Sequence, residues 1–195
     1  MNEMKLLFFS VVTLPDSVTK PPTMPRFQSR PDDAERRKNA GTRAAEHSPE
    51  RSDWRVLPVI WCSAEYQAAI ELRHRVLRAP LGLTFTADEL DAEAEQRHFA
   101  GLLERQLIAT VSVTQLPEGG VKLRQMVVDP DFQRRGWGRA LLQEVERQLA
   151  EHGHRKLSLH ARETAVGFYA AAGYLHEGET FEEVGLPHRR MIKEF

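Results

Sequence analysis

The stretch LRQMVVDPDFQRRGWGRALL, residues 123–142, decides how the chain is interpreted. Its first six residues predict a strand, which ends at Asp129 and Pro130. A helix then begins, and its first turn contains Gly136 and Gly138. Unpaired backbone N–H groups converge at such a helix start, and the helix dipole favours an anion there. The stretch therefore predicts a binding site for a phosphorylated ligand.

The side chains around this turn fit the same ligand. Glycine lets a diphosphate approach the main chain, where a Cβ would stand in its way. A glycine inside a helix otherwise costs roughly 1 kcal/mol relative to alanine, so a functional reason is favoured. Arg134, Arg135 and Arg139 bring guanidinium groups that pair well with phosphate oxygens. Each arginine taken alone is equally typical of a solvated helix face.

Composition bounds the remaining possibilities. With 195 residues and 41% hydrophobic content, the chain can bury one substantial core. Its 27 Lys+Arg and 28 Asp+Glu leave a formal net charge of -1, so we expect neither nucleic acid nor membrane as a partner. The single cysteine, Cys62, cannot form an internal disulfide or a thiolate metal site. It fits a reducing compartment, and we expect a cytoplasmic protein.

The N-terminal quarter of the chain differs from the rest. Residues 15–53 contain six prolines among many charges and few large apolar side chains. Such a composition cannot bury enough surface to offset the entropy of ordering, so we predict a disordered extension over residues 1–53. The apolar run at 6–14 is too short to span a bilayer and lacks the flanks of a signal peptide. Three interpretations of this run remain open. It could be an export signal, an adhesive tail, or part of an extension upstream of a start at Met24.

The spacing of apolar residues predicts an α+β protein, with its folded domain at residues 54–195. We expect Ser63 to cap the first helix, and Pro80 to end it. The buried face of that helix is predicted to hold Tyr66, Ala69, Ile70, Val76 and Leu77. The expected elements are a strand at 55–61, a helix at 63–78, a short helix from Thr86, antiparallel strands at 98–103, 107–116 and 121–128, the glycine-containing helix, a strand at 156–160, a helix at 163–172 and an antiparallel pair at 174–181 and 189–195 around a bend at 185–187.

Two motifs carry a resemblance to a known family. Residues 133–138, QRRGWG, match the Q/R-x-x-G-x-G/A acetyl-CoA signature of the GNAT family of N-acetyltransferases. Ala165, Phe168, Tyr169 and Gly173-Tyr174 follow the spacing of that family's A-x-x-F-Y-x-x-x-G-F/Y segment. The resemblance covers residues 54–195 and points to a small bacterial branch of unassigned substrate. It implies a mixed, mostly antiparallel central sheet flanked by helices, with one splayed parallel strand pair.

The resemblance also implies how acetyl-CoA is held as cosubstrate. In such proteins the pantetheine arm lies between two splayed parallel strands, here 123–128 and 156–160. The Val128 N–H would then polarise the thioester carbonyl, while Trp137 would pack or form a wall. Arg162 stands where many members have an asparagine, and it cannot accept hydrogen bonds. An acidic acceptor, a pairing with Glu163 or Glu182, and a surface position near a helix start are open for it. The residues implied for cofactor binding are Met126, Val127, Val128, Gln133, Arg134, Arg135, Gly136, Trp137, Gly138, Arg139 and Arg162.

Catalysis requires a donor for the leaving thiolate and a base for the amine. Tyr169 matches the residue that points a phenol at the cofactor sulfur in this family, although helical spacing also fits a core tyrosine. His160 ends the strand beside the cofactor and titrates near neutral pH, so it is our candidate base. Other candidates for the base, besides water, are Glu163, Glu182, Glu183 and His188.

The function expected from these features is an N-acyltransferase that uses no metal. It would move an acetyl group from acetyl-CoA to a primary amine of a small molecule or peptide by direct transfer. Arg73, Arg75 and Arg78 are candidates for the acceptor pocket, which would suit an acceptor with a carboxylate or phosphate. A non-catalytic acyl-CoA-binding module and an interaction domain without cofactor are the alternatives. We expect a homodimer, the commonest oligomer of soluble proteins.

Overall fold

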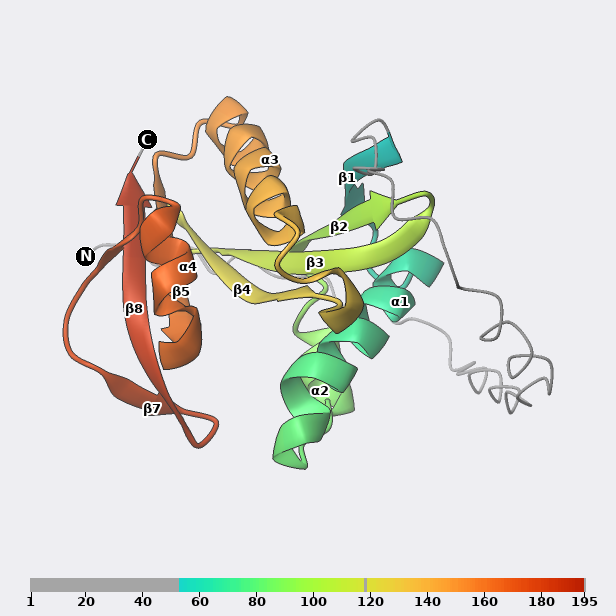
Figure 1. Ribbon diagram of the computed structural model, residues 1–195, viewed down its shortest axis with the longest axis horizontal. Helices are drawn as coiled ribbons and strands as arrows, with labels where there is room; N and C mark the ends of the chain where they lie inside the picture. Colours follow the sequence, from blue (N-terminus) through green and yellow to red (C-terminus); the bar gives the residue numbers. More distant parts are fainter. Residues whose placement is uncertain (1–52, 118, 195) are drawn as a thin grey trace, which may run out of the picture. The chain divides into compact units, whose positions relative to one another are not determined.

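Figure 1 shows the computed structural model, which describes residues 53–117 and 119–194. The predicted disordered extension, the apolar run at 6–14 and Met24 lie outside the described residues, so those predictions stay predictions. Within the described part of the chain, no helix is long and apolar enough to cross a membrane.

A mixed sheet forms the centre of the domain, with strands in the order β1-β2-β3-β4-β5-β8-β6 and β7 paired to β8. Only β4 and β5 run parallel, and every other pair is antiparallel. The predicted fold class is confirmed. The strands are β1 (Trp54–Val59), β2 (Arg97–Leu103), β3 (Gln106–Gln115), β4 (Val121–Val128), β5 (Lys156–Arg162), β6 (Leu175–His176), β7 (Phe181–Glu183) and β8 (Leu186–Glu194).

Two short hairpins set the register of the antiparallel strands. Glu104 and Arg105 both have positive φ, 49° and 71°, as a two-residue hairpin turn requires, and the predicted meander of β2, β3 and β4 is confirmed. Val184 and Gly185 form the same kind of turn between β7 and β8. The predicted bend at 185–187 is therefore placed too late, because β8 begins at Leu186. The strand predicted at 174–181 is broken into β6 and β7.

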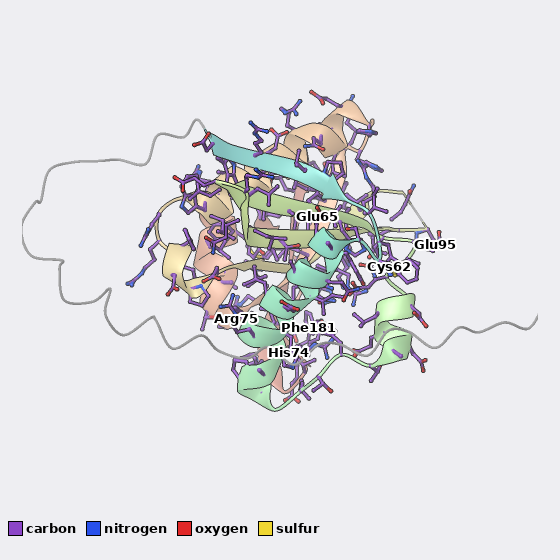
Figure 2. All side chains as sticks on the ribbon, turned by 90° about the vertical axis from the view of Figure 1, so that its right-hand side faces the viewer. Cys62, Glu65, His74, Arg75, Glu95 and Phe181 are labelled. Carbon is purple, nitrogen blue, oxygen red and sulfur yellow. The ribbon has the colours of Figure 1, made fainter. Side chains whose placement is uncertain are left out.

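One face of the sheet carries α1 (Ala64–Arg73), whose N-terminus is capped by Ser63 as predicted. Figure 2 looks onto this helix, with Cys62 at its start and His74 and Arg75 at its end. The helix continues as a π-helical segment, η3 (His74–Arg78), and a 3-10 turn, Ala79–Leu81. The single α-helix predicted to residue 78 is thus interrupted, just before Pro80, which has no N–H to donate. The short helix predicted from Thr86 is α2 (Ala87–Asp91), which starts with a capping box.

Helix α3 (Trp137–Glu151) packs on the opposite face of the sheet from α1, as Figure 1 shows. The 3-10 turn Pro130–Phe132 precedes it, and a second one, Glu163–Ala165, precedes α4 (Val166–Ala171). The helix predicted at 163–172 is therefore α-helical only in its later part. The core between α3 and the sheet includes Phe99, Val111, Leu123, Leu141, Leu142, Val145, Leu149, Leu157, Leu159, Tyr174 and Met191.

Candidate active site

The parallel strands β4 and β5 separate part-way along their length. They pair at only three positions, from Val121 opposite Leu157 to Leu123 opposite Leu159, although both strands continue further. The register between β3 and β4 shifts at this point, and Gln125 adopts a positive φ of 51°. Such a bulge bends its strand. The result is a gap between two strands whose facing backbone groups are no longer paired to each other.

Backbone groups at the end of β4 are turned into this gap. The Asp129 N–H donates to the Ile108 carbonyl at 2.8 Å. The alternation of an antiparallel ladder then directs the N–H and C=O of the preceding Val128 away from β3. Gln133 Nε2 donates to the Val128 carbonyl at 2.8 Å. The Val128 N–H is thus left facing the gap.

A groove of about 700 Å³ runs from this gap to the start of α3, and we call it the α3–α4 groove. Its apolar lining includes Phe168, whose side chain is 37% exposed. Arg134 and Arg139 border it, whereas Arg135 lies 5.8 Å from the Phe132 ring and does not line it. The groove is lined by Val76, Leu77, Met126, Val127, Val128, Gln133, Arg134, Gly136, Gly138, Arg139, Thr164, Ala165, Phe168, Tyr169, Ala171 and Ala172.

The glycine turn provides open space and free amides beside this groove. Arg134 and Gly136 both have positive φ, 60° and 88°, and Gly136 is the N-cap of α3. The first backbone N–H groups of a helix have no partner within it, so they are free to bind an anion. A Cβ added to Gly138 would lie 3.4 Å from Val128 Cγ2 and would occupy the floor of the groove. The turn therefore fits a phosphorylated ligand that comes close to the main chain.

Besides Arg135, two further residues predicted to bind the cofactor lie outside the groove. Trp137 is 5% exposed, its ring centroid lies 5.0 Å from that of Trp54, and it does not line the groove. Arg162 does not line the groove, and its Nη2 donates to the Leu77 carbonyl at 2.9 Å. Arg162 therefore pairs with neither Glu163 nor Glu182. Its hydrogen-bond acceptor is instead a backbone carbonyl of η3.

On the other side of the gap lies a second hollow of about 230 Å³, which we call the charged cavity. It shares Leu77, Met126, Ala165 and Tyr169 with the groove, and Met126 and Tyr169 are in contact with each other. The Tyr169 hydroxyl contacts Met126 Sδ at 3.6 Å, and burial raises the pKa of Tyr169 to about 12. The cavity is lined by Leu77, Arg78, Lys122, Leu123, Arg124, Gln125, Met126, Leu159, His160, Ala161, Arg162, Ala165, Tyr169, Glu183, Val184 and His188.

A cluster of titratable side chains lies in the charged cavity. His160 Nδ1 is 2.5 Å from Glu183 Oε2, and Lys122 Nζ is 3.1 Å from each ring nitrogen. Burial alone would raise the pKa of Glu183, but the hydrogen bond and charge of His160 hold that pKa below its usual range. Burial lowers the pKa of Lys122. The cluster can therefore accept a proton at the imidazole, with the carboxylate fixing the ring.

Comparison with known proteins assigns this architecture to a family. The acetyltransferase (GNAT) domain matches residues 82–195, more than half of the chain. The chain belongs to the GNAT acetyltransferase family. Among relatives, the uncharacterised protein YyaT of Bacillus subtilis (strain 168) is 30% identical over 108 residues, which are 55% of this chain and 72% of YyaT.

Solved structures show the GNAT fold as well. An acyl-CoA N-acyltransferase from Pseudomonas aeruginosa is 20% identical, with a TM-score of 0.61, over 72% of this chain and 99% of that one. A GNAT family acetyltransferase from Elizabethkingia anophelis, solved with acetyl-CoA bound, is 14% identical, with a TM-score of 0.57, over 73% of this chain and 99% of that one.

Within this GNAT domain, the remaining candidate bases are arranged differently from His160. His188 borders the charged cavity, but it is buried and its Nδ1 lies 2.9 Å from the Leu186 carbonyl. Glu163 accepts a hydrogen bond from Arg189 at 2.9 Å, outside the cavity. Glu182 is exposed and does not line it.

The arginines expected at the acceptor pocket are only partly there. Arg73 is buried and forms an ion pair with Glu93 at 2.8 Å, so its predicted place in the pocket is wrong. Arg75, labelled in Figure 2, donates to Asp129 at 2.6 Å and does not line the cavity. Arg78 does border the cavity and pairs with Glu89.

Sequence reasoning missed three polar residues of the cavity, Lys122, Arg124 and Gln125. A signal for Lys122 existed. It pairs with Ser158, and strand alternation then places it on the same face as His160, two residues further along β5. Gln125 carried no such signal, because its role at the bulge depends on the distant residue Glu93, to which its Nε2 donates at 3.0 Å.

Proposed function

We propose that this protein moves an acetyl group from acetyl-CoA to the primary amine of a small molecule or peptide by direct transfer, using residues 54–195. The observation that carries the proposal is the meeting of the α3–α4 groove and the charged cavity at Met126 and Tyr169. A donor held in the groove and an acceptor held in the cavity would reach each other through the gap between β4 and β5. Membership of the GNAT family and the acetyl-CoA in the Elizabethkingia structure support this assignment.

The groove residues have the properties that acetyl-CoA needs. When bound, acetyl-CoA supplies an acyl group activated as a thioester. The backbone amides of residues 134–139 and the guanidinium groups of Arg134 and Arg139 would hold the diphosphate. The open edges of β4 and β5 would pair with the amide groups of the arm, as an added strand does. The Val128 N–H would donate to the acyl carbonyl oxygen, where negative charge develops.

Proton transfer on the acceptor side is assigned to His160. Its Nδ1 is engaged by Glu183, so we assign removal of the proton from the attacking amine to Nε2, which also has Lys122 Nζ at 3.1 Å. A carboxylate in this position orients the ring and stabilises its charged form. Lys122 Nζ adjoins the same ring, at 3.1 Å from each nitrogen.

Tyr169 is assigned to the leaving group. With a pKa of about 12 the phenol is protonated at neutral pH, so it can donate a hydrogen bond to the leaving sulfur. Full proton transfer to a thiolate is unfavourable, because the thiol has a pKa of only about 8.5. Tyr169 therefore stabilises the thiolate, and water completes its protonation.

The test is release of free thiol from acetyl-CoA on addition of a panel of primary amines. We expect turnover above the buffer rate, and a fall in kcat/KM of about a hundredfold or more for His160→Ala. His176→Ala, an exposed position on β6, is the matched control and should leave kcat/KM unchanged. Binding of acetyl-CoA without turnover for any amine would instead support the acyl-CoA-binding alternative.

A further inference from the structure

The charged cavity has an unequal distribution of charge. Four cationic side chains line it, Arg78, Lys122, Arg124 and Arg162, against the single carboxylate of Glu183. Arg78 is neutralised by Glu89 at 2.9 Å, and Glu183 is engaged by His160. The remaining three cations therefore dominate the field inside the cavity.

None of these three cations forms a close ion pair in the described part of the chain, although the charge of Glu183 acts on Lys122 across the cavity. No carboxylate of residues 53–117 or 119–194 forms a salt bridge with Lys122, Arg124 or Arg162. Arg162 donates to the Leu77 carbonyl and Lys122 contacts only the His160 ring, both neutral acceptors when the imidazole is uncharged. Burial lowers the pKa of both Arg162 and Lys122. Arg124 is exposed, whereas Lys122 and Arg162 are partly buried. Partly desolvated cations without a close counter-ion are costly, and an anion placed beside them would offset that cost.

Resting on the proposed function, we propose that the acceptor is a small amine that also carries a carboxylate or phosphate, which Lys122, Arg124 and Arg162 bind. The amine end lies toward Met126 and Tyr169, where the cavity meets the groove. The anionic end lies toward Lys122 and Arg124, earlier on β4. Diamines and other cationic acceptors are disfavoured, because a second ammonium group would face the same three cations.

The test compares amines that differ only in their far end. The probes are 5-aminopentanoate, its carboxamide and 1,5-diaminopentane, with phosphoethanolamine against ethanolamine as a second pair. We expect kcat/KM to be at least about tenfold higher for the anionic member of each set, the value of one charge-assisted hydrogen bond. Arg124→Gln should remove most of this preference, because it should lower kcat/KM for the anionic probes far more than for the carboxamide. Arg155→Gln, an exposed arginine outside the cavity, is the matched control and should retain the preference.

The outcomes separate this inference from the proposed function. Turnover that favours the carboxamide or the diamine overturns the anionic acceptor and leaves acetyl transfer standing. A preference that Arg124→Gln does not change overturns the assigned cations. If no probe is acetylated, calorimetry on the acetyl-CoA complex still decides the matter, since binding of 5-aminopentanoate and not of its carboxamide supports the inference and the reverse overturns it.

Discussion

At the scale of single residues, Tyr169 and His160 lie on opposite faces of the opened strand pair. Tyr169 approaches from α4, and its hydroxyl contacts Met126 Sδ without a stronger acceptor. His160 projects from β5 on the face that carries α1, together with Lys122. A thioester held between β4 and β5 would therefore have a phenol on one side and an imidazole on the other.

Tyr169→Phe tests the phenol alone. The change keeps the ring that packs 5.6 Å from Tyr174 and removes only the hydroxyl. We expect kcat to fall by no more than about a hundredfold, which is the lower limit of the rate effects known for general acid catalysis. The effect is small because a phenol with a raised pKa is a weak proton donor. Steady-state kinetics with acetyl-CoA should show an unchanged KM. A KM increase without loss of kcat would assign Tyr169 to cofactor packing instead.

At the scale of elements, a buried polar network joins α1, the segment after α2 and the bulge in β4. Glu93 accepts hydrogen bonds from Arg73 at 2.8 Å, from the Tyr66 hydroxyl at 2.8 Å and from Gln125 at 3.0 Å. Gln125 is the residue with positive φ at which β4 bends away from β5. The network therefore supports the strained backbone that opens the gap.

Glu93→Gln tests this network and its response to pH. Removing the charge leaves Arg73 buried without a counter-ion, so we expect a loss of about 3 to 5 kcal/mol in the free energy of unfolding at pH 7. Burial alone would raise the pKa of Glu93, but the hydrogen bond and charge of Arg73 hold it below its ordinary value. This contribution is complete above the unfolded-state pKa of about 4.3 and is lost as the pH falls through the lowered folded-state pKa.

Urea unfolding between pH 7 and pH 3 measures both effects. The free energy of unfolding of the wild type should decline over the acidic part of this range. The difference in free energy of unfolding between the wild type and Glu93→Gln should become smaller over the same range. Glu163→Gln, which removes an exposed pair with Arg189, is the control and should cost less than about 1 kcal/mol. Equal losses for the two variants would show that the Glu93 network does not carry this stability.

At the scale of the whole molecule, binding and folding are linked. Acetyl-CoA at a hundred times its dissociation constant should stabilise the native state by about 2.7 kcal/mol, seen as a higher Tm. Gly138→Ala should raise the Tm of the free protein slightly, because a helical glycine costs up to about 1 kcal/mol. The same variant should show a smaller Tm increase with acetyl-CoA, since the added Cβ fills the floor of the groove. An undiminished increase would place the cofactor outside the α3–α4 groove.

Local sequence patterns were enough for much of the architecture. Ser63 and Thr86 cap helices as expected, and the apolar spacing of α3 matches its buried face. Exceptions arise where a residue responds to a distant partner. Arg73 was expected at a pocket, but it is buried against Glu93, and Arg162 bonds to Leu77 and not to an acidic neighbour. Side-chain direction along an element is periodic, whereas the choice of partner depends on which elements meet.

By itself, the sequence determined the meander of β2, β3 and β4, the caps of α1 and α2, and the glycine turn beside which the α3–α4 groove forms. These depend on interactions over a few residues, such as caps, turns and alternation. Only the tertiary structure decided that Lys122 of β4, His160 of β5 and Glu183 of β7 form one cluster. Strand pairing brings together segments that are far apart in the chain, and no local preference encodes which cations are then left without a counter-ion.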